Sequence, residues 1–310
     1  MLPIIRITIF LFSLGCLLPQ SVSANPPDKL KVVVTIKPLH SLVAALMQGI
    51  TEPQLLLDTT QSVHHSHLRP SDYRKLADAD IVFWAGTALE TFIPTLAKKY
   101  QDHVSFISLM QIKGITLLPV RGKQDTSHRS STDPDADDIR FIDPHFWLSP
   151  DNARQIVIGV SQELIAHDRS NESGYLLNRA QTLKRIDQLA KRLDDELDNT
   201  RTPFITYHDA YQYFEKEYRL NRVASVNLNE ETTPGIRQIR SIKWMITERK
   251  IPCLFFEAPT RPAIIDTLLD HSEIQAVELD ALGFNLKAGP ELWFELLDRI
   301  GNKMARCLRQ

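Results

Sequence analysis

The sequence contains histidine and carboxylate side chains that could bind a transition metal. They are His64, His65 and His67 in one short cluster, and His145, His208 and Asp280 at separate places further along the chain. Imidazole nitrogen suits Zn²⁺, Cu, Ni and Fe ions, whereas Mn²⁺, Mg²⁺ and Ca²⁺ prefer oxygen ligands. Three imidazoles and one carboxylate make a good tetrahedral set for Zn²⁺. These residue types indicate a metal site and favour zinc as its occupant.

The elements predicted around these residues would bring four of them together. His64 and His208 come after predicted strands, Asp280 ends a third strand, and His145 comes just before a predicted helix. In open α/β sheets, ligands bind in the crevice beyond the carboxyl ends of the strands. Two of the four residues belong to each half of the chain, so we expect one metal site between two lobes.

Strands and helices alternate along the predicted chain, which is typical of α/β folds with parallel sheets. Short β-branched or apolar runs predict the strands, and apolar residues at helical spacing predict the helices. The predicted strands are 31–36, 54–57, 81–84, 204–207, 223–226, 253–256 and 276–279. The predicted helices are 39–47, a short one that opens at 69–72, 150–166, 176–197, 210–218, 235–249, 261–270 and 291–307.

The longest predicted helix divides the chain into two α/β lobes. We predict an N-terminal lobe at 25–173, a connecting helix at 174–200 and a C-terminal lobe at 201–310. Within the first lobe, residues 121–138 are polar and end in an Asp-rich run, which predicts a long surface loop.

The composition is that of an ordinary globular protein. The 310 residues include 36 Lys and Arg against 38 Asp and Glu, which gives a formal net charge of −2. This balance argues against a broad nucleic-acid-binding surface. The 43% of hydrophobic residues argues against intrinsic disorder.

Residues 1–24 have the features of a cleaved signal peptide. Arg6 precedes the apolar stretch Ile7–Leu18, and the small residues at 22–24 form a cleavage site. A buried N-terminal strand is a weaker alternative. Lipidation at Cys16 is another, disfavoured because Ser13 stands where an aliphatic residue is expected. We expect cleavage after Ala24 and export to the periplasm.

Cleavage there would leave the mature chain with two cysteines, Cys253 and Cys307. In an oxidising compartment such a pair usually forms a disulfide. Two thiolates in a metal site are the alternative, but no CxxC spacing supports it. A bridge between them would stabilise the C-terminal half by roughly 4 kcal/mol in the chain-entropy model.

A series of motifs resembles one family, the metal-binding solute-binding proteins of ABC importers, and within it the zinc-specific, ZnuA-like members. The motifs cover essentially the mature chain and are, in order, IKPLHSLVAAL at 36–46, SVHHSHLRPSD at 62–72, DPHFWLSPDNAR at 143–154, ITYHDAYQYFEK at 205–216, TTPG at 232–235, FFEAPTRPAII at 255–265 and ELDALG at 278–283. The resemblance implies two (β/α) lobes joined by a long helix. It also implies that Zn²⁺ is held between the lobes and passed to a membrane permease.

The resemblance places the first metal-binding histidine of the family on His64, before the LRPSD segment. The family usually has SPHDY there, whereas this chain has SVHHS, so the proline and the acid are replaced. His65 and His67 therefore compete with His64 as the ligand.

The other family ligands fall on His145, His208 and Asp280. Manganese-binding relatives carry a carboxylate at the third position, so His208 favours zinc. In zinc members, water or another acid can replace the carboxylate at Asp280. The two cysteines fall where zinc members form their disulfide.

The favoured function is a periplasmic, high-affinity zinc-binding protein that delivers Zn²⁺ to an ABC permease in the inner membrane. We expect a monomer with neither enzymatic activity nor a nucleic-acid partner. A manganese or iron carrier on the same scaffold is an alternative, against which His208 argues. A zinc hydrolase is weaker, because the sequence has no HExxH motif and no evident general base beside a ligand. An adhesin or structural protein without metal is the remaining alternative.

Overall fold

Two parallel four-stranded sheets form the framework of the computed structural model, which describes residues 29–58, 68–121, 141–227, 234–259 and 261–309. The first sheet has the order β2-β1-β3-β4, with every neighbouring pair parallel. Its strands are β1 (Val32–Val34), β2 (Gln54–Leu55), β3 (Ile81–Trp84) and β4 (Ser105–Ser108). The central strands β1 and β3 are buried over their whole length, as expected for a parallel sheet covered on both faces.

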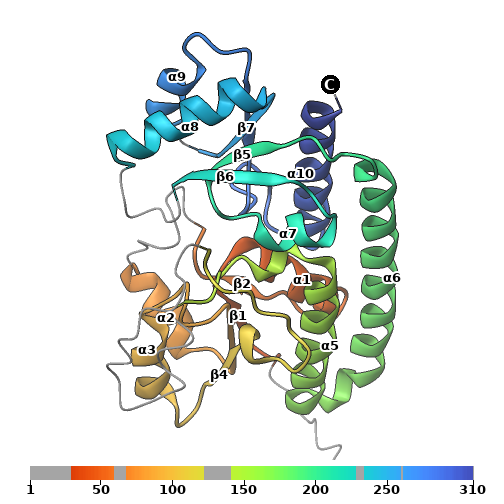
Figure 1. The fold of residues 1–310 in the computed structure, drawn as a ribbon. Helices are drawn as coiled ribbons and strands as arrows, with labels where there is room; N and C mark the ends of the chain where they lie inside the picture. The colour runs from red at the N-terminus through yellow and green to blue at the C-terminus, as the bar shows by residue number, and fades with distance from the viewer. Residues whose placement is uncertain (1–28, 59–67, 122–140, 228–233, 260, 310) are drawn as a thin grey trace, which may run out of the picture.

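The second sheet repeats this arrangement with the order β6-β5-β7-β8, again parallel throughout. Its strands are β5 (Phe204–His208), β6 (Arg222–Asn227), β7 (Cys253–Glu257) and β8 (Gln275–Leu279). The two sheets lie one above the other in Figure 1, with β5 and β6 near the boundary between the halves.

Helices pack around both sheets. They are α1 (Lys37–Met47), α2 (Pro70–Ala77), α3 (Ile93–Tyr100), α5 (Pro150–His167), α6 (Glu172–Leu197), α7 (Gln212–Glu217), α8 (Ile236–Arg249), α9 (Ile264–Leu269) and α10 (Leu292–Leu308). The 26-residue helix α6 contacts α1 and α5 from the first half and α10 from the second. It runs along one side of the molecule past both sheets, so a single rigid element is common to the two halves (Figure 1).

The structure confirms the predicted α/β class, the two parallel sheets and the long mid-chain helix. Two elements, α3 and β4, were not predicted. β4 has the sequence SFIS and lies at the edge of its sheet, so it lacks the continuous apolar run of a central strand. Only Ile93 and Leu96 of α3 are buried, too few to produce a clear helical period. The division at 173/174 and 200/201 stays a prediction, and nearly all of the predicted loop 121–138 lies outside the described residues.

A disulfide between Cys253 and Cys307 confirms the predicted pairing and excludes the thiolate metal site. It joins the first residue of β7 to the last turn of α10, across a sequence separation of 54 residues. Both cysteines are buried, so the bond lies inside the hydrophobic core.

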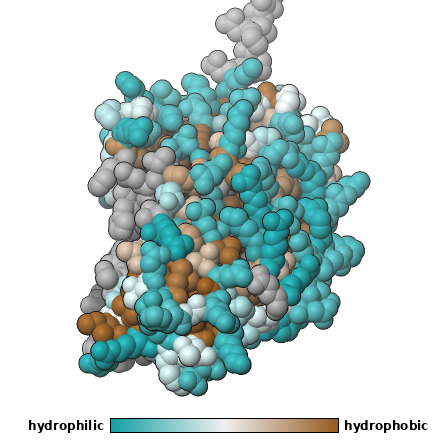
Figure 2. Space-filling model, turned by 90° about the horizontal axis from the view of Figure 1, so that it is seen from above, coloured by the Kyte–Doolittle hydropathy of each residue, from teal (hydrophilic) through white to brown (hydrophobic). Residues whose placement is uncertain are grey.

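The surface seen from above is mostly hydrophilic, with apolar atoms emerging in small groups (Figure 2). Of the large apolar side chains that the structure describes, Ile236 (71%) and Trp244 (60%), both on α8, have the largest exposed fractions. Among the described residues, no helix is both long and apolar enough to span a bilayer.

Glu90 is a completely buried carboxylate at the carboxyl ends of two central strands of the first sheet. It accepts a hydrogen bond from Thr35 Oγ1, which follows β1. It also accepts the backbone N–H groups of Ala85 (3.2 Å) and Gly86 (3.0 Å), which follow β3. Burial raises its pKa from 4.5 to about 7, with these hydrogen bonds opposing the shift.

This raised pKa predicts a pH-dependent stability. The folded form holds the proton to higher pH than the unfolded chain, so the free energy of unfolding falls as pH rises from about 4.5 to about 7. Glu90→Gln removes this titration. We expect the difference in free energy of unfolding, wild type minus Glu90→Gln, to fall by roughly 3 kcal/mol between pH 4.5 and pH 7. Denaturant unfolding at several pH values measures it, with the exposed Glu273→Gln as control, and a pH-independent difference would contradict the assignment.

Candidate metal centre

His208 is the last residue of β5, at the carboxyl edge of the second sheet. The strand FITYH is almost entirely buried, which fixes the backbone on which the imidazole sits. The side chain is itself largely buried, with 7% of the residue exposed. The structure thus places this histidine at the sheet edge where ligands of α/β proteins collect.

His145 comes from the other half of the chain and is 5% exposed. It stands directly before a 3₁₀ turn at Phe146–Leu148, which leads into α5. Ser149 caps α5 by accepting the backbone N–H of Asn152 (3.2 Å), and Pro150 takes the first helical position. The predicted helix start therefore holds this imidazole in place.

The structure brings these two imidazoles together. The ring centroids of His145 and His208 are 5.3 Å apart, with 73° between the ring planes. Imidazole nitrogen reaches Zn²⁺ at about 2.0–2.1 Å, so rings at this separation can bind one ion. Two residues 63 positions apart in sequence, one from each half, thus form the centre of the candidate site.

Asp143 orients His145. Its Oδ1 accepts hydrogen bonds from the ring Nδ1 (2.8 Å) and from the backbone N–H (3.0 Å) of that histidine. Gln212 on α7 donates to the other carboxylate oxygen at 3.1 Å. A neutral imidazole that donates through Nδ1 carries its lone pair on Nε2, which is the arrangement of a metal-binding histidine backed by a carboxylate.

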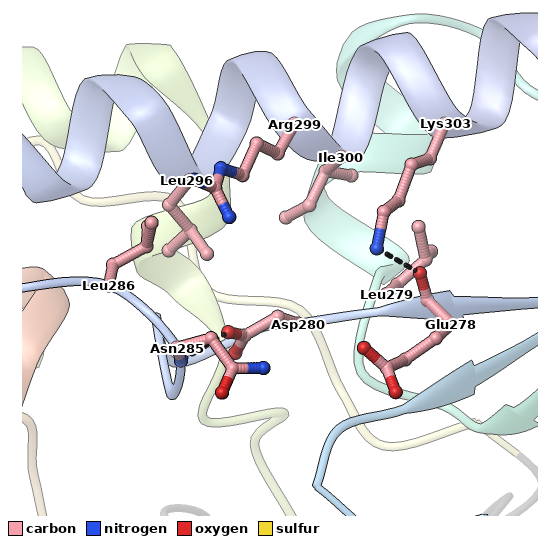
Figure 3. A pocket seen from close by; sticks show the side chains of 9 residues that line it. All are labelled: Glu278, Leu279, Asp280, Asn285, Leu286, Leu296, Arg299, Ile300 and Lys303. Atoms are coloured by element: carbon pink, nitrogen blue, oxygen red, sulfur yellow. Dashed lines mark hydrogen bonds between the residues drawn. The ribbon is translucent and has the colours of Figure 1, made fainter.

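Asp280 directly follows β8, at the same carboxyl edge as His208. Its Oδ1 accepts the backbone N–H groups of Leu282 (3.0 Å) and Gly283 (2.8 Å), so this oxygen stabilises the turn after the strand. Figure 3 shows Asp280 beside Asn285, among residues that line a small cavity under α10.

Trp147 connects the Asp280 turn to the segment that carries His145. Its indole Nε1 donates to the carbonyl of Ala281 at 2.9 Å. Even so, the described residues contain no group of three or more His, Cys, Asp or Glu side chains placed to hold a metal. His64, His65 and His67 lie outside the described residues, so the predicted ligand set stays a prediction.

Sequence reasoning missed further carboxylates near this edge. Glu257 ends β7, the strand between those of His208 and Asp280. Tyr211 is completely buried, and its pKa is raised by burial first and then by the charges of Glu257, Asp280 and Glu278. This edge therefore carries negative charge, which favours a cation. The position of Glu257 at the end of a predicted strand was the available signal.

Comparison with known proteins identifies the family. The model of the ZnuA family, described as zinc-uptake complex component A, periplasmic, matches residues 32–307. The chain belongs to the ZnuA family. The high-affinity zinc uptake system protein ZnuA of Brucella abortus is 30% identical over 304 residues, which cover 89% of this chain and 91% of that protein. The protein of the same name from Yersinia pestis is 27% identical over 290 residues, or 90% and 91% of the two chains.

Solved structures share the fold of this ZnuA family member. A crystal structure of ZnuA superposes with a TM-score of 0.77 at 20% identity, over 91% of this chain and all of that one. The solute-binding protein FpvC of Pseudomonas aeruginosa, solved with Mn²⁺, gives 0.76 at 18% identity over 91% and 99%. A Zn(II)-bound AdcAII variant of Streptococcus pneumoniae also shares the fold, with a TM-score of 0.74 at 21% identity. The same fold thus occurs in proteins solved with Mn²⁺ and with Zn²⁺, so the fold alone does not determine which metal binds.

The Asp143–His145 contact predicts a measurable effect on metal binding. Asp143→Asn should weaken Zn²⁺ binding by about 10- to 100-fold, the usual cost of losing a carboxylate behind a metal-binding histidine. Competition with a chelating dye measures the affinity. Asp151→Asn, an exposed carboxylate in the first turn of α5, is the control. Unchanged affinity in a folded Asp143→Asn variant would show that Asp143 does not orient a ligand.

Proposed function

We propose that this chain is a periplasmic zinc-binding protein that captures Zn²⁺ and delivers it to an ABC-type permease in the inner membrane. The observation that carries the proposal is the pair of buried imidazoles at His145 and His208, which come from opposite halves and have ring centroids 5.3 Å apart. Membership of the ZnuA family supports the same function. A site between two halves suits a carrier, because the cargo can be enclosed during transit and released where the halves separate.

The proposed ligands are His64, His145 and His208, with Asp280 as the fourth. Asp143 supports His145 in this set by fixing the tautomer of its ring. Asp280 could bind the metal through Oδ2, because the backbone N–H of Asn285 that contacts this oxygen lies 3.4 Å away. A set of three imidazoles and one carboxylate is a tetrahedral zinc set.

Zinc is preferred to manganese or iron because of the donor atoms. The fold resembles that of FpvC solved with Mn²⁺, so overall shape does not select the metal. An imidazole at His208 replaces the oxygen donor that Mn²⁺ prefers. A hydrolase is disfavoured, because the relatives are named as components of a zinc uptake system.

Export and assembly complete the proposal. Residues 1–24 would direct the chain to the periplasm and be removed after Ala24. The mature protein would act as a monomer, since both halves of the proposed site come from one chain.

Alanine substitutions test the ligand set. His145→Ala and His208→Ala should each weaken Zn²⁺ binding by more than about 100-fold, beyond the loss expected for a residue behind a ligand. The metal-free variants should stay folded, because both side chains lie at the ends of elements and not within the hydrophobic core. Dye competition gives the affinity and circular dichroism the fold, with the exposed His271→Ala as control.

The same assay fixes the register of the histidine cluster. His64→Ala should cost more affinity than His65→Ala or His67→Ala. A larger loss of affinity at His65 or His67 would assign the metal-binding role to that residue instead of His64. Near-unchanged affinity in both the His145 and the His208 variants would contradict the proposed site.

The affinity should fall in acid. A histidine must be neutral to bind metal, and an imidazole in a peptide titrates near pH 6.5. Protons therefore displace zinc as pH falls from about 7.5 to about 5, by up to about three orders of magnitude per pH unit well below the ligand pKa values. The zinc-induced rise in melting temperature should shrink in parallel. A flat affinity across this range would instead indicate carboxylate ligands, which titrate near 4.

A further inference from the structure

Four charged side chains form a cluster where the two halves meet beside His208. They are Arg121, from the first half, and Asp209, Glu215 and Arg222, from the second. Arg121 donates through Nη1 to Asp209 Oδ1 at 2.7 Å and through Nη2 to Glu215 Oε2 at 2.6 Å. Arg222 faces the same two carboxylates at 3.7 and 3.4 Å. One guanidinium thus bridges two carboxylates across the boundary between the halves.

The carboxylates of this cluster are deeply buried. The side chains of Asp209 and Glu215 are 4% and 3% exposed, whereas that of Arg121 is 28% exposed. Burial raises the pKa of Glu215, and the charges of Arg121 and Arg222 oppose that rise. A buried carboxylate without a cationic partner is strongly destabilising, so the cluster depends on its two arginines.

The backbone connects Arg121 to the segment that carries His145. The N–H of Val120 donates to the carbonyl of Phe141 at 2.7 Å, and the N–H of Asp143 donates to the carbonyl of Leu118 at 2.8 Å. An antiparallel bridge pairs the residues in between. Arg121 and Asp143 therefore belong to one two-stranded segment, and Asp143 orients His145.

Two further residues of α7, Tyr213 and Gln212, form hydrogen bonds with the same two-stranded segment. Tyr213 donates from Oη to the carbonyl of Asp143 at 2.8 Å and accepts the N–H of Leu118 at 2.9 Å. Gln212 donates to the carbonyl of Pro119 at 3.0 Å. The groups that form these hydrogen bonds are uncharged, whereas Arg121 adds ion pairs between the same segments.

We propose that Arg121 is a positioning residue that holds the segment bearing His145 against the segment bearing His208, and so sets how long the site retains its metal. Asp209 follows His208 directly, so its link to Arg121 acts one residue from the proposed ligand. This inference rests on the proposed function, since it concerns retention of the same Zn²⁺. Arg222 compensates the same charges from within the second half, and among the described residues its ion pairs are to Asp209 and Glu215 of that half.

Two double variants separate the link from the charge balance. Both carry Glu215→Gln together with one Arg→Ala substitution, so each variant keeps one carboxylate and one arginine of the cluster. Arg121→Ala/Glu215→Gln cuts the link between the halves, and Arg222→Ala/Glu215→Gln keeps it. Stopped-flow dissociation of Zn²⁺ into excess chelator gives the release rate. We expect release at least about tenfold faster from the first variant and within about threefold of wild type from the second.

Amide hydrogen exchange on the zinc-free proteins tests the link without the cargo. The N–H groups of Leu118 and Val120 should exchange faster in the Arg121 double variant and at the wild-type rate in the Arg222 double variant. Equal release rates from the two variants, or equal exchange at these amides, would overturn the role of Arg121. Absence of zinc binding by the wild-type protein would instead overturn the proposed function. The exchange experiment would still test whether Arg121 links the two halves.

Discussion

The approach of two imidazoles across a boundary is the feature on which the other parts of the site depend. His145 and His208 are separated by 63 residues, yet their ring centroids lie 5.3 Å apart. The sheet edge fixes one ring, and the 3₁₀ turn before α5 fixes the other. Both rings are largely buried, so a cation between them would be shielded from water. Electrostatic interactions between the cation and its ligands are stronger in such an interior than in water.

Contacts besides the shared helix α6 keep the two halves in one relative arrangement. α6 packs against α1, α5 and α10, which limits how the halves can move relative to each other. Close to the site, indole and phenol groups make directional bonds across the boundary. Trp147 donates to Ala281 at 2.9 Å, and Trp293 donates to the carbonyl of Trp147 at 2.8 Å. Because buried polar groups lose free energy when left unpaired, these bonds favour one arrangement of the interface over displaced ones.

Sequence reasoning located the elements whose patterns are local. The buried strand before His208 and the Ser-Pro start of α5 are visible in a few consecutive residues, and both histidines they position could be named. β4 was missed because an edge strand need not be apolar throughout. Arg121 was missed for another reason. Its partners lie 88 and 94 positions away in the sequence, and no local sequence pattern predicts a contact between residues so far apart in the chain. The role of Asp143 likewise required knowing which ring nitrogen of His145 it faces.

The position of the bound metal tests most directly whether His145 and His208 share one ion. Crystals of the zinc-loaded protein, measured on both sides of the zinc absorption edge, would show where the ion binds and which atoms surround it. We expect one strong anomalous peak within about 2.0–2.1 Å of a ring nitrogen of both His145 and His208. A peak that contacts only one of these rings, or a fully occupied zinc site elsewhere in the chain with none between them, would contradict it.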